Sequence, residues 1–268
     1  MKQRPSFPAR LDSVTPAAKP QTLLGATRVL TKPQTTAARH APTPLASPTG
    51  VGLDSSAIRA RMVQKLAEQG VDDAVVLDAM GRIERHRFVD SALVNQAYED
   101  TSLPIGLGQT ISKPNVVARM IALLREAPGL QGQAMGRVLE IGTGCGYQAA
   151  VLSLVAREVY SIERLRGLHD KARENLRPMR LPNVHVIFGD GMLGYPQGAP
   201  YSAIIAAAGG EAVPQAWIDQ LAVGGRIVAP MQTATGQQAL VVIDKTSQGL
   251  QQSLLEAVHF VPLKSGIA

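Results

Sequence analysis

The chain has 268 residues, of which 45% are hydrophobic and 18% charged, enough to bury a sizeable core. No stretch approaches the ~20 apolar residues needed to cross a bilayer, and no charged-then-apolar signal segment opens the chain, so we expect neither a membrane protein nor a secreted precursor. The single cysteine, Cys145, excludes an intramolecular disulfide framework and a cysteine-cluster metal site, so we expect a cytoplasmic protein without a metal.

The net charge of +6 is confined to the first 50 residues, which hold seven basic residues and one acidic residue. The same stretch contains 8 of the 18 prolines and no sustained apolar period. We predict that residues 1–52 form a disordered, basic, proline-rich extension, with targeting or a weak contact to an anion as alternatives. The remaining chain is neutral, so we expect no nucleic acid partner and no membrane partner.

A helical lobe is predicted after residue 53. The side chains of 54–56 can cap a helix in which Ile58, Met62 and Leu66 recur at one-turn spacing, and this helix is expected to end near Gly70. Asp73 can cap a second short helix. We interpret residues 53–115 as this lobe followed by a substrate loop.

Strands and helices alternate beyond residue 116, which predicts parallel strands with crossover helices on both faces. The predicted strands are 137–141, 158–162, 184–188, 201–206 and 226–229, and the predicted helices are 116–124, 147–156, 165–176 and 217–221. Two further strands, 238–244 and 254–261, follow without an intervening helix. They are expected to pair antiparallel at a sheet edge.

A glycine-rich loop follows the strand 137–141. Gly142, Gly144 and Gly146 lie at the start of a helix, where glycine permits a tight turn and lets a ligand approach free backbone N–H groups. This predicts a nucleotide or nucleoside site, although the three glycines alone would also suit a plain strand-to-helix turn. Tyr147 stands where the dinucleotide fingerprint has glycine or alanine, which disfavours an oxidoreductase.

Two carboxylates follow successive strands. Glu163 lies 21 residues after Gly142, the spacing expected of a group that binds ribose hydroxyls. Asp190 follows the strand 184–188, where its side chain or adjacent backbone can meet an adenine edge. Ligands of open α/β sheets bind at the carboxyl ends of strands, so we expect both residues to face one ligand. Cys145 also lies in the glycine loop, where a small side chain suits the packing. We therefore do not expect it to be a nucleophile.

The segment Pro104-Ile-Gly-Leu-Gly-Gln-Thr-Ile-Ser-Lys-Pro114, together with the glycine loop, resembles the protein-L-isoaspartate O-methyltransferase family. The resemblance covers residues 53–263 and includes the stretches 85–89, 189–191, 220–228 and 260–263. It implies a doubly wound, mostly parallel, seven-stranded Rossmann-like methyltransferase sheet. The domain would then span 53–268, with cofactor binding in 116–268. Ser202, where the family commonly has aspartate, departs from its pattern.

The resemblance further implies methyl transfer from S-adenosyl-L-methionine to the free carboxylate of isoaspartyl residues in damaged proteins and peptides. It assigns Ser112 as the active-site serine and gives cofactor contacts to Thr110, Ile111, Gly142, Thr143, Gly144, Glu163, Asp190 and Gly191. A monomer is expected.

The chemistry of this reaction suits a site without a histidine–carboxylate pair. An isoaspartyl carboxylate has a pKa near ~4, so it is already an anion at neutral pH and needs no general base. We therefore interpret Ser112 as an orienting hydrogen-bond donor. The alternatives are a methyltransferase of the same fold acting on a small molecule or nucleic acid, and a non-catalytic binding module.

Overall fold

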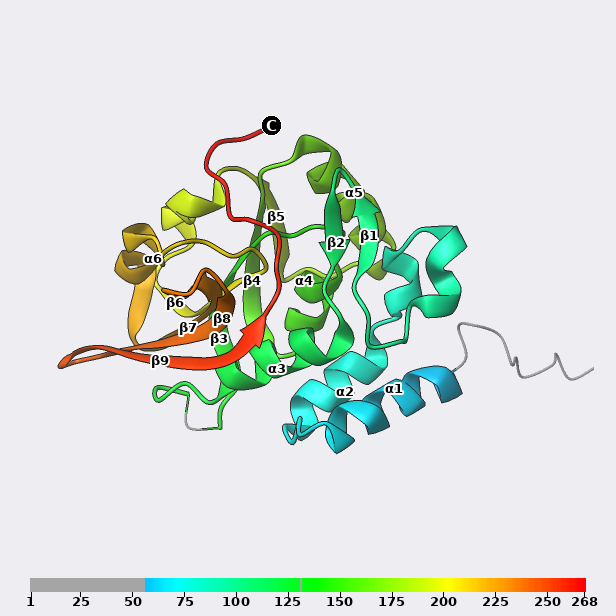
Figure 1. The fold of residues 1–268 in the computed structure, drawn as a ribbon, viewed down its shortest axis with the longest axis horizontal. Coiled ribbons are helices and arrows are strands. Elements are labelled where there is room, and N and C mark those ends of the chain that lie inside the picture. The colour runs from blue at the N-terminus through cyan, green and yellow to red at the C-terminus, as the bar shows by residue number, and fades with distance from the viewer. Residues whose placement is uncertain (1–55, 131) are drawn as a thin grey trace, which may run out of the picture. The chain divides into compact units, whose positions relative to one another are not determined.

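The computed structural model describes residues 56–130 and 132–268 (Figure 1). The predicted extension 1–52 and the first two capping residues, 54 and 55, lie outside the described residues. None of the described helices is long and apolar enough to cross a membrane.

The N-terminal lobe is helical, as predicted. It contains α1 (Ser56–Glu68), α2 (Ala74–Arg82) and two 3-10 helices, η1 (Arg85–Phe88) and η2 (Ser91–Gln96). The Asp73 carboxylate caps α2 by accepting the backbone N–H groups of Val75 and Val76 at 2.9 and 3.1 Å. It also pairs with Arg125 at 2.6 Å, which ties the lobe to α3 (Pro114–Arg125).

A seven-stranded sheet forms the centre of the described chain, in the order β5-β4-β3-β6-β7-β8-β9 (Figure 1). The first five strands in that order run parallel, and β8 and β9 pair antiparallel at one edge, which confirms the predicted architecture. The strands are β3 (Met135–Ile141), β4 (Ala156–Glu163), β5 (Val184–Phe188), β6 (Tyr201–Ala206), β7 (Leu221–Gln232), β8 (Gln238–Thr246) and β9 (Gly249–Val258). The connecting helices are α4 (Tyr147–Leu152), α5 (Arg166–Leu176) and α6 (Gln215–Gln220), with short 3-10 turns η3 (Arg177–Met179), η4 (Gly191–Leu193) and η5 (Pro196–Gly198).

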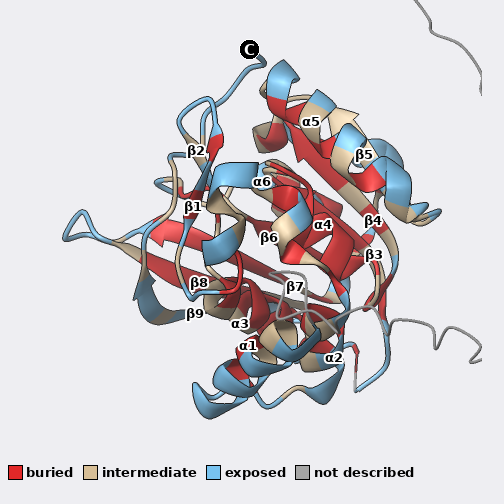
Figure 2. Cartoon of the chain, turned by 90° about the vertical axis from the view of Figure 1, so that its right-hand side faces the viewer, coloured by how far each residue is buried: buried red, intermediate tan, exposed pale blue. Residues whose placement is uncertain are grey.

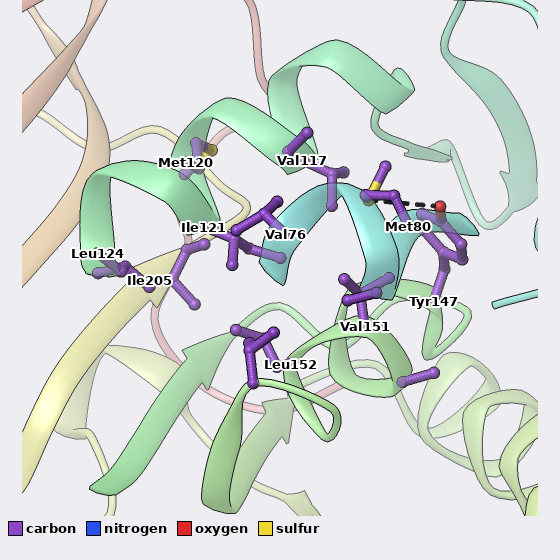
Figure 3. Packing of buried hydrophobic residues seen from close by; sticks show 14 of the residues in the cluster. Val76, Met80, Val117, Met120, Ile121, Leu124, Tyr147, Val151, Leu152 and Ile205 are labelled. Atoms are coloured by element: carbon purple, nitrogen blue, oxygen red, sulfur yellow. Dashed lines mark hydrogen bonds between the residues drawn. The ribbon is translucent and has the colours of Figure 1, made fainter. Parts of the chain in front are cut away.

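The core lies on both faces of this sheet, because alternate residues of a strand point to opposite sides. Val138 of β3 belongs to the cluster packed by α2, α3 and α4, whereas Leu139 belongs to the cluster around Trp217 of α6. In Figure 2 the central strands β3, β6 and β8 are largely buried, whereas the edge strand β9 is mostly exposed. Helix α4 is wholly buried, and α1 and α5 keep an exposed outer face. In Figure 3 the side chains of Met80 and Tyr147 meet, joining the helical lobe to α4.

Two elements differ from the sequence-based prediction. The helix predicted over 147–156 ends at Leu152, because Ala156 already pairs with Met135 as the first residue of β4. The segment predicted as a shaped loop is a hairpin of β1 (Leu103–Gly106) and β2 (Gln109–Ile111). Its tip, residues 106–108, has positive φ at all three positions, which is the backbone that a tight hairpin turn requires.

Candidate active site

A cavity of about 480 Å³ opens at the carboxyl ends of β3 and β4, and we call it the inner cavity. The hairpin β1-β2, the glycine loop after β3 and the coil after β9 form its walls. It brings together eight of the nine residues that the sequence assigned to the site: Thr110, Ile111, Ser112, Gly142, Thr143, Gly144, Glu163 and Gly191. The ninth, Asp190, is not among the lining residues.

The glycine loop leaves the sheet through backbone that only glycine adopts easily. Gly142, Gly144 and Gly146 have φ of 90°, 58° and 93°, in the left-handed region. A Cβ on Gly144 would lie 3.1 Å from the Ile105 side chain of the hairpin. The loop therefore passes close to the hairpin while it exposes its backbone to the inner cavity.

Glu163 ties this loop to the end of β4. Its Oε2 accepts the N–H of Gly144 and its Oε1 accepts the N–H of Leu165, each at 2.9 Å. The side chain is nearly buried yet lines the inner cavity. Because each carboxylate oxygen has a second lone pair, Glu163 can still accept a hydroxyl of a bound ligand.

Asp190 instead holds two backbone groups. Its Oδ1 accepts the N–H of Met192 at 2.9 Å, capping η4, and its Oδ2 accepts the N–H of Gly266 at 2.6 Å. Its neighbour Gly191 does line the inner cavity, and the carbonyl of Gly191 accepts a hydrogen bond from the Trp217 indole at 2.8 Å. The buried Trp217 therefore supports the wall of the site, which its sequence position did not reveal.

A buried polar network behind the glycine loop was also missed from the sequence. Ser161 donates to the Glu140 carboxyl, and the Thr143 and Ser161 hydroxyls lie 2.6 Å apart. Complete burial raises the pKa of Glu140 to about 8. The available signal was a glutamate between the buried apolar residues Leu139 and Ile141.

Two donors of α5 hold the loops around the inner cavity. Lys171 donates to the carbonyl of Ile105 in the hairpin at 2.8 Å, and Asn175 donates to the carbonyl of Cys145 at 2.9 Å. Cys145 itself is buried, and its burial raises the pKa of the thiol to about 11. A thiol with a raised pKa is largely protonated at neutral pH, which makes it a poor nucleophile.

A second cavity of about 530 Å³, the outer cavity, lies between α3 and the end of β9. The two cavities share four lining residues: Thr110, Ser112, Ala207 and Val261. Ser112 is half-buried, and within the described residues its hydroxyl has no hydrogen-bond partner. A free hydroxyl thus stands where a ligand in one cavity would meet a ligand in the other.

The inner cavity also fits a cofactor with a polar, charged end. The Gln148 side chain is buried, lines this cavity and faces the Glu140 carboxyl, where it partly offsets the rise in the pKa of that group. The backbone of the glycine loop and the Glu163 carboxylate also line the cavity, and they can bind polar groups and hydroxyls of a ligand.

Comparisons with known proteins agree on one family. The family model described as protein-L-isoaspartate(D-aspartate) O-methyltransferase matches residues 57–268. A protein-L-isoaspartate O-methyltransferase of Methylibium petroleiphilum is 58% identical over 267 residues, which cover 98% of this chain and 96% of that protein. One of Leptothrix cholodnii is 64% identical over 219 residues, covering 81% and 77%.

Solved structures show the same fold. A protein-L-isoaspartate O-methyltransferase structure matches with a TM-score of 0.69 and 29% identity, covering 78% of this chain and 67% of that one. A Plasmodium falciparum structure described as a beta-aspartate methyltransferase in complex with S-adenosyl-L-homocysteine matches with a TM-score of 0.64 and 24% identity, covering 77% and 98%.

Proposed function

The chain belongs to the protein-L-isoaspartate(D-aspartate) O-methyltransferase family, and on that premise we propose that Ser112 orients the substrate carboxylate for methylation. The enzyme transfers a methyl group from S-adenosyl-L-methionine to the free carboxylate of L-isoaspartyl residues in damaged proteins and peptides, which initiates their repair. The observation that carries our proposal is that Ser112 lines both cavities.

We assign the inner cavity to the cofactor. The glycine loop, Glu163 and Gln148 would hold it, and the hairpin residues Thr110 and Ile111 would cover it. The bound cofactor supplies a sulfonium methyl group, which is transferred without any protein group acting as a nucleophile. Asp190 contributes through its neighbour Gly191, which lines the inner cavity, while its own side chain caps η4 and accepts the N–H of Gly266.

The outer cavity is assigned to the isoaspartyl peptide. Its carboxylate is already ionised, so the protein has to position one oxygen about 3 Å from the methyl carbon and exclude water. The Ser112 hydroxyl can donate one hydrogen bond to the other carboxylate oxygen. A single fixed donor leaves the attacking oxygen less solvated than it is in water, and that raises its reactivity.

Substitution of Ser112 tests this proposal. The Ser112→Ala variant should lower kcat for an isoaspartyl peptide by roughly tenfold to a hundredfold, because the donor that holds the carboxylate in line with the methyl group is lost. Its affinity for S-adenosylmethionine, measured by calorimetry, should stay unchanged.

The matched control is Ser102→Ala, since Ser102 lines the outer cavity without reaching the inner one. This variant should keep its kcat. A Ser112→Ala enzyme with wild-type kcat would show that the hydroxyl does not orient the substrate.

The same proposal includes three broader expectations. A single chain carries both cavities, which supports a monomeric enzyme. One buried cysteine in the described chain supports a cytoplasmic location. Residues 53–268 are proposed as the methyltransferase domain, because every element that lines the site lies within them.

A further inference from the structure

The outer cavity is crossed by an ion pair that the proposed reaction does not use. Arg119 of α3 forms one wall and Glu256 of β9 forms the opposite wall. The Arg119 Nε lies 3.3 Å from the Glu256 Oε1, and the two side chains keep 36% and 46% of their surface exposed. These residues are 137 positions apart, so the pair exists only because the fold brings the walls together.

This ion pair is weak enough for a substrate to replace it. Exposed pairs of this kind contribute little to stability, because water and salt screen them and both side chains lose entropy. A peptide that enters between α3 and β9 can therefore separate Arg119 from Glu256 at small cost. Once separated from Glu256, the Arg119 guanidinium can pair with a carboxylate of the peptide.

The charged groups around the outer cavity single out Arg119 as the cation available to an anionic group of a peptide. Its lining contains two permanent cations, Lys113 and Arg119, against one anion, Glu256. Lys113 lies 3.8 Å from Asp100, whose other oxygen accepts the N–H of Asn115 at 2.8 Å. Lys113 is thus already paired on its own side of the cavity. Arg119 instead pairs with Glu256 on the opposite wall.

We propose that Arg119 selects substrates carrying an acidic side chain near the isoaspartyl residue, by exchanging Glu256 for that side chain. This inference rests on the proposed assignment of the outer cavity to the peptide. Ser112 lies two residues before α3, and Arg119 is the sixth residue of that helix, so the helical rise from Pro114 to Arg119 is about 7.5 Å. An extended peptide covers a separation of this size in two to three residues, so the preferred acidic residue lies two to four positions from the isoaspartate.

A panel of matched peptides tests the selection. Each peptide has one isoaspartate and carries Glu, Gln or Lys at one position, two to four residues away on either side. At one of these positions the wild-type enzyme should show a KM for the Glu peptide about two- to fivefold below that for the Gln peptide, and a higher KM for the Lys peptide. The kcat should be the same for all three.

Variants assign the effect to Arg119. Arg119→Gln should abolish the difference in KM between the Glu and Gln peptides, and Arg119→Lys should restore part of it. Glu256→Gln should widen the difference, because Arg119 then has no competing carboxylate. The control is Arg173→Gln, an exposed residue of α5 that lines neither cavity and makes the same change in charge.

The outcomes separate the two proposals. If the wild-type enzyme methylates no isoaspartyl peptide, the proposed function fails. If it methylates all peptides with equal KM, or if Arg119→Gln keeps the preference for Glu, the function stands and the role of Arg119 is overturned.

Discussion

At the scale of single residues, the Glu140 carboxyl is an ionisable group removed from water. It is fully buried in β3, accepts a hydrogen bond from Ser161 and faces the Gln148 side chain. Burial favours its neutral form, which explains why its pKa rises to about 8. Through Ser161 of β4, these hydrogen bonds attach Thr143 of the glycine loop to the sheet.

This raised pKa predicts how stability depends on pH. Between about pH 4.5 and 8 the folded chain keeps the Glu140 proton that the unfolded chain has already released. The unfolded state therefore binds fewer protons, and this residue makes the free energy of unfolding fall by roughly 1.4 kcal/mol per pH unit in that window. Glu140→Gln removes the titration while keeping an acceptor for Ser161.

The measurement is urea unfolding of both proteins from pH 5 to pH 9. The variant should gain stability relative to the wild type as the pH rises, and the difference should level off above about pH 8. A difference that stays constant over the whole range would mean that Glu140 is ionised in the folded protein.

At the scale of elements, the coil after β9 connects the sheet edge to the cofactor side of the molecule. Arg164 Nε donates to the carbonyl of Gly266 at 2.9 Å, the N–H of Ala268 donates to the Arg164 carbonyl at 2.8 Å, and the N–H of Arg166 donates to the Ala268 carbonyl at 2.7 Å. With the Gly266 to Asp190 hydrogen bond, these contacts hold the coil against the start of α5. Earlier residues of the same coil, 261–264, line the inner cavity.

Gly266→Pro is predicted to release the end of this coil. Proline has no N–H for Asp190, and it requires a negative φ where Gly266 has 76°. The amides of Arg166 and Ala268 should exchange with deuterium faster, while the global free energy of unfolding changes by less than about 1 kcal/mol, because the segment is exposed. Ile267→Ala, a change at an exposed side chain, is the control and should leave exchange unaltered.

If the Arg166 amide keeps its protection in the proline variant, the coil is held by contacts other than these hydrogen bonds. Hydrogen exchange read by mass spectrometry resolves the relevant peptides.

At the scale of the whole molecule, the excess positive charge and the strands of the sheet lie in different parts of the chain. The net charge of +6 is carried by the first 50 residues, whereas every strand of the sheet lies beyond residue 134 in a neutral part of the chain. We expect deletion of residues 1–52 to leave the thermal unfolding midpoint and the kcat/KM for an isoaspartyl peptide unchanged. The shortened protein should lose its retention on a cation exchanger.

The control for that comparison is that the full-length and the shortened protein express equally and give the same circular dichroism spectrum. A lower midpoint or a lost activity would show that the first 52 residues belong to the methyltransferase domain.

The sequence by itself determined the features that depend on local patterns. Buried strands appear as apolar runs, so β5 and β6 were predicted with the bounds that the structure gives them. The glycine loop and the segment 104–114 are continuous in the chain, and they identified the family and six of the predicted site residues that line the inner cavity. Ser202 departs from the family pattern, and the structure shows its hydroxyl bonded to the Arg137 carbonyl at 3.0 Å.

Only the tertiary structure decided which distant groups meet. Asn175 supports the glycine loop from 30 residues away, Trp217 supports Gly191 from 26, and Arg119 reaches Glu256 from 137. No local pattern marks such partners, because their contact depends on how helices pack onto the sheet and not on neighbouring residues. The meeting of the two cavities at Ser112 has the same origin, since their walls come from a hairpin, a helix and the last strand.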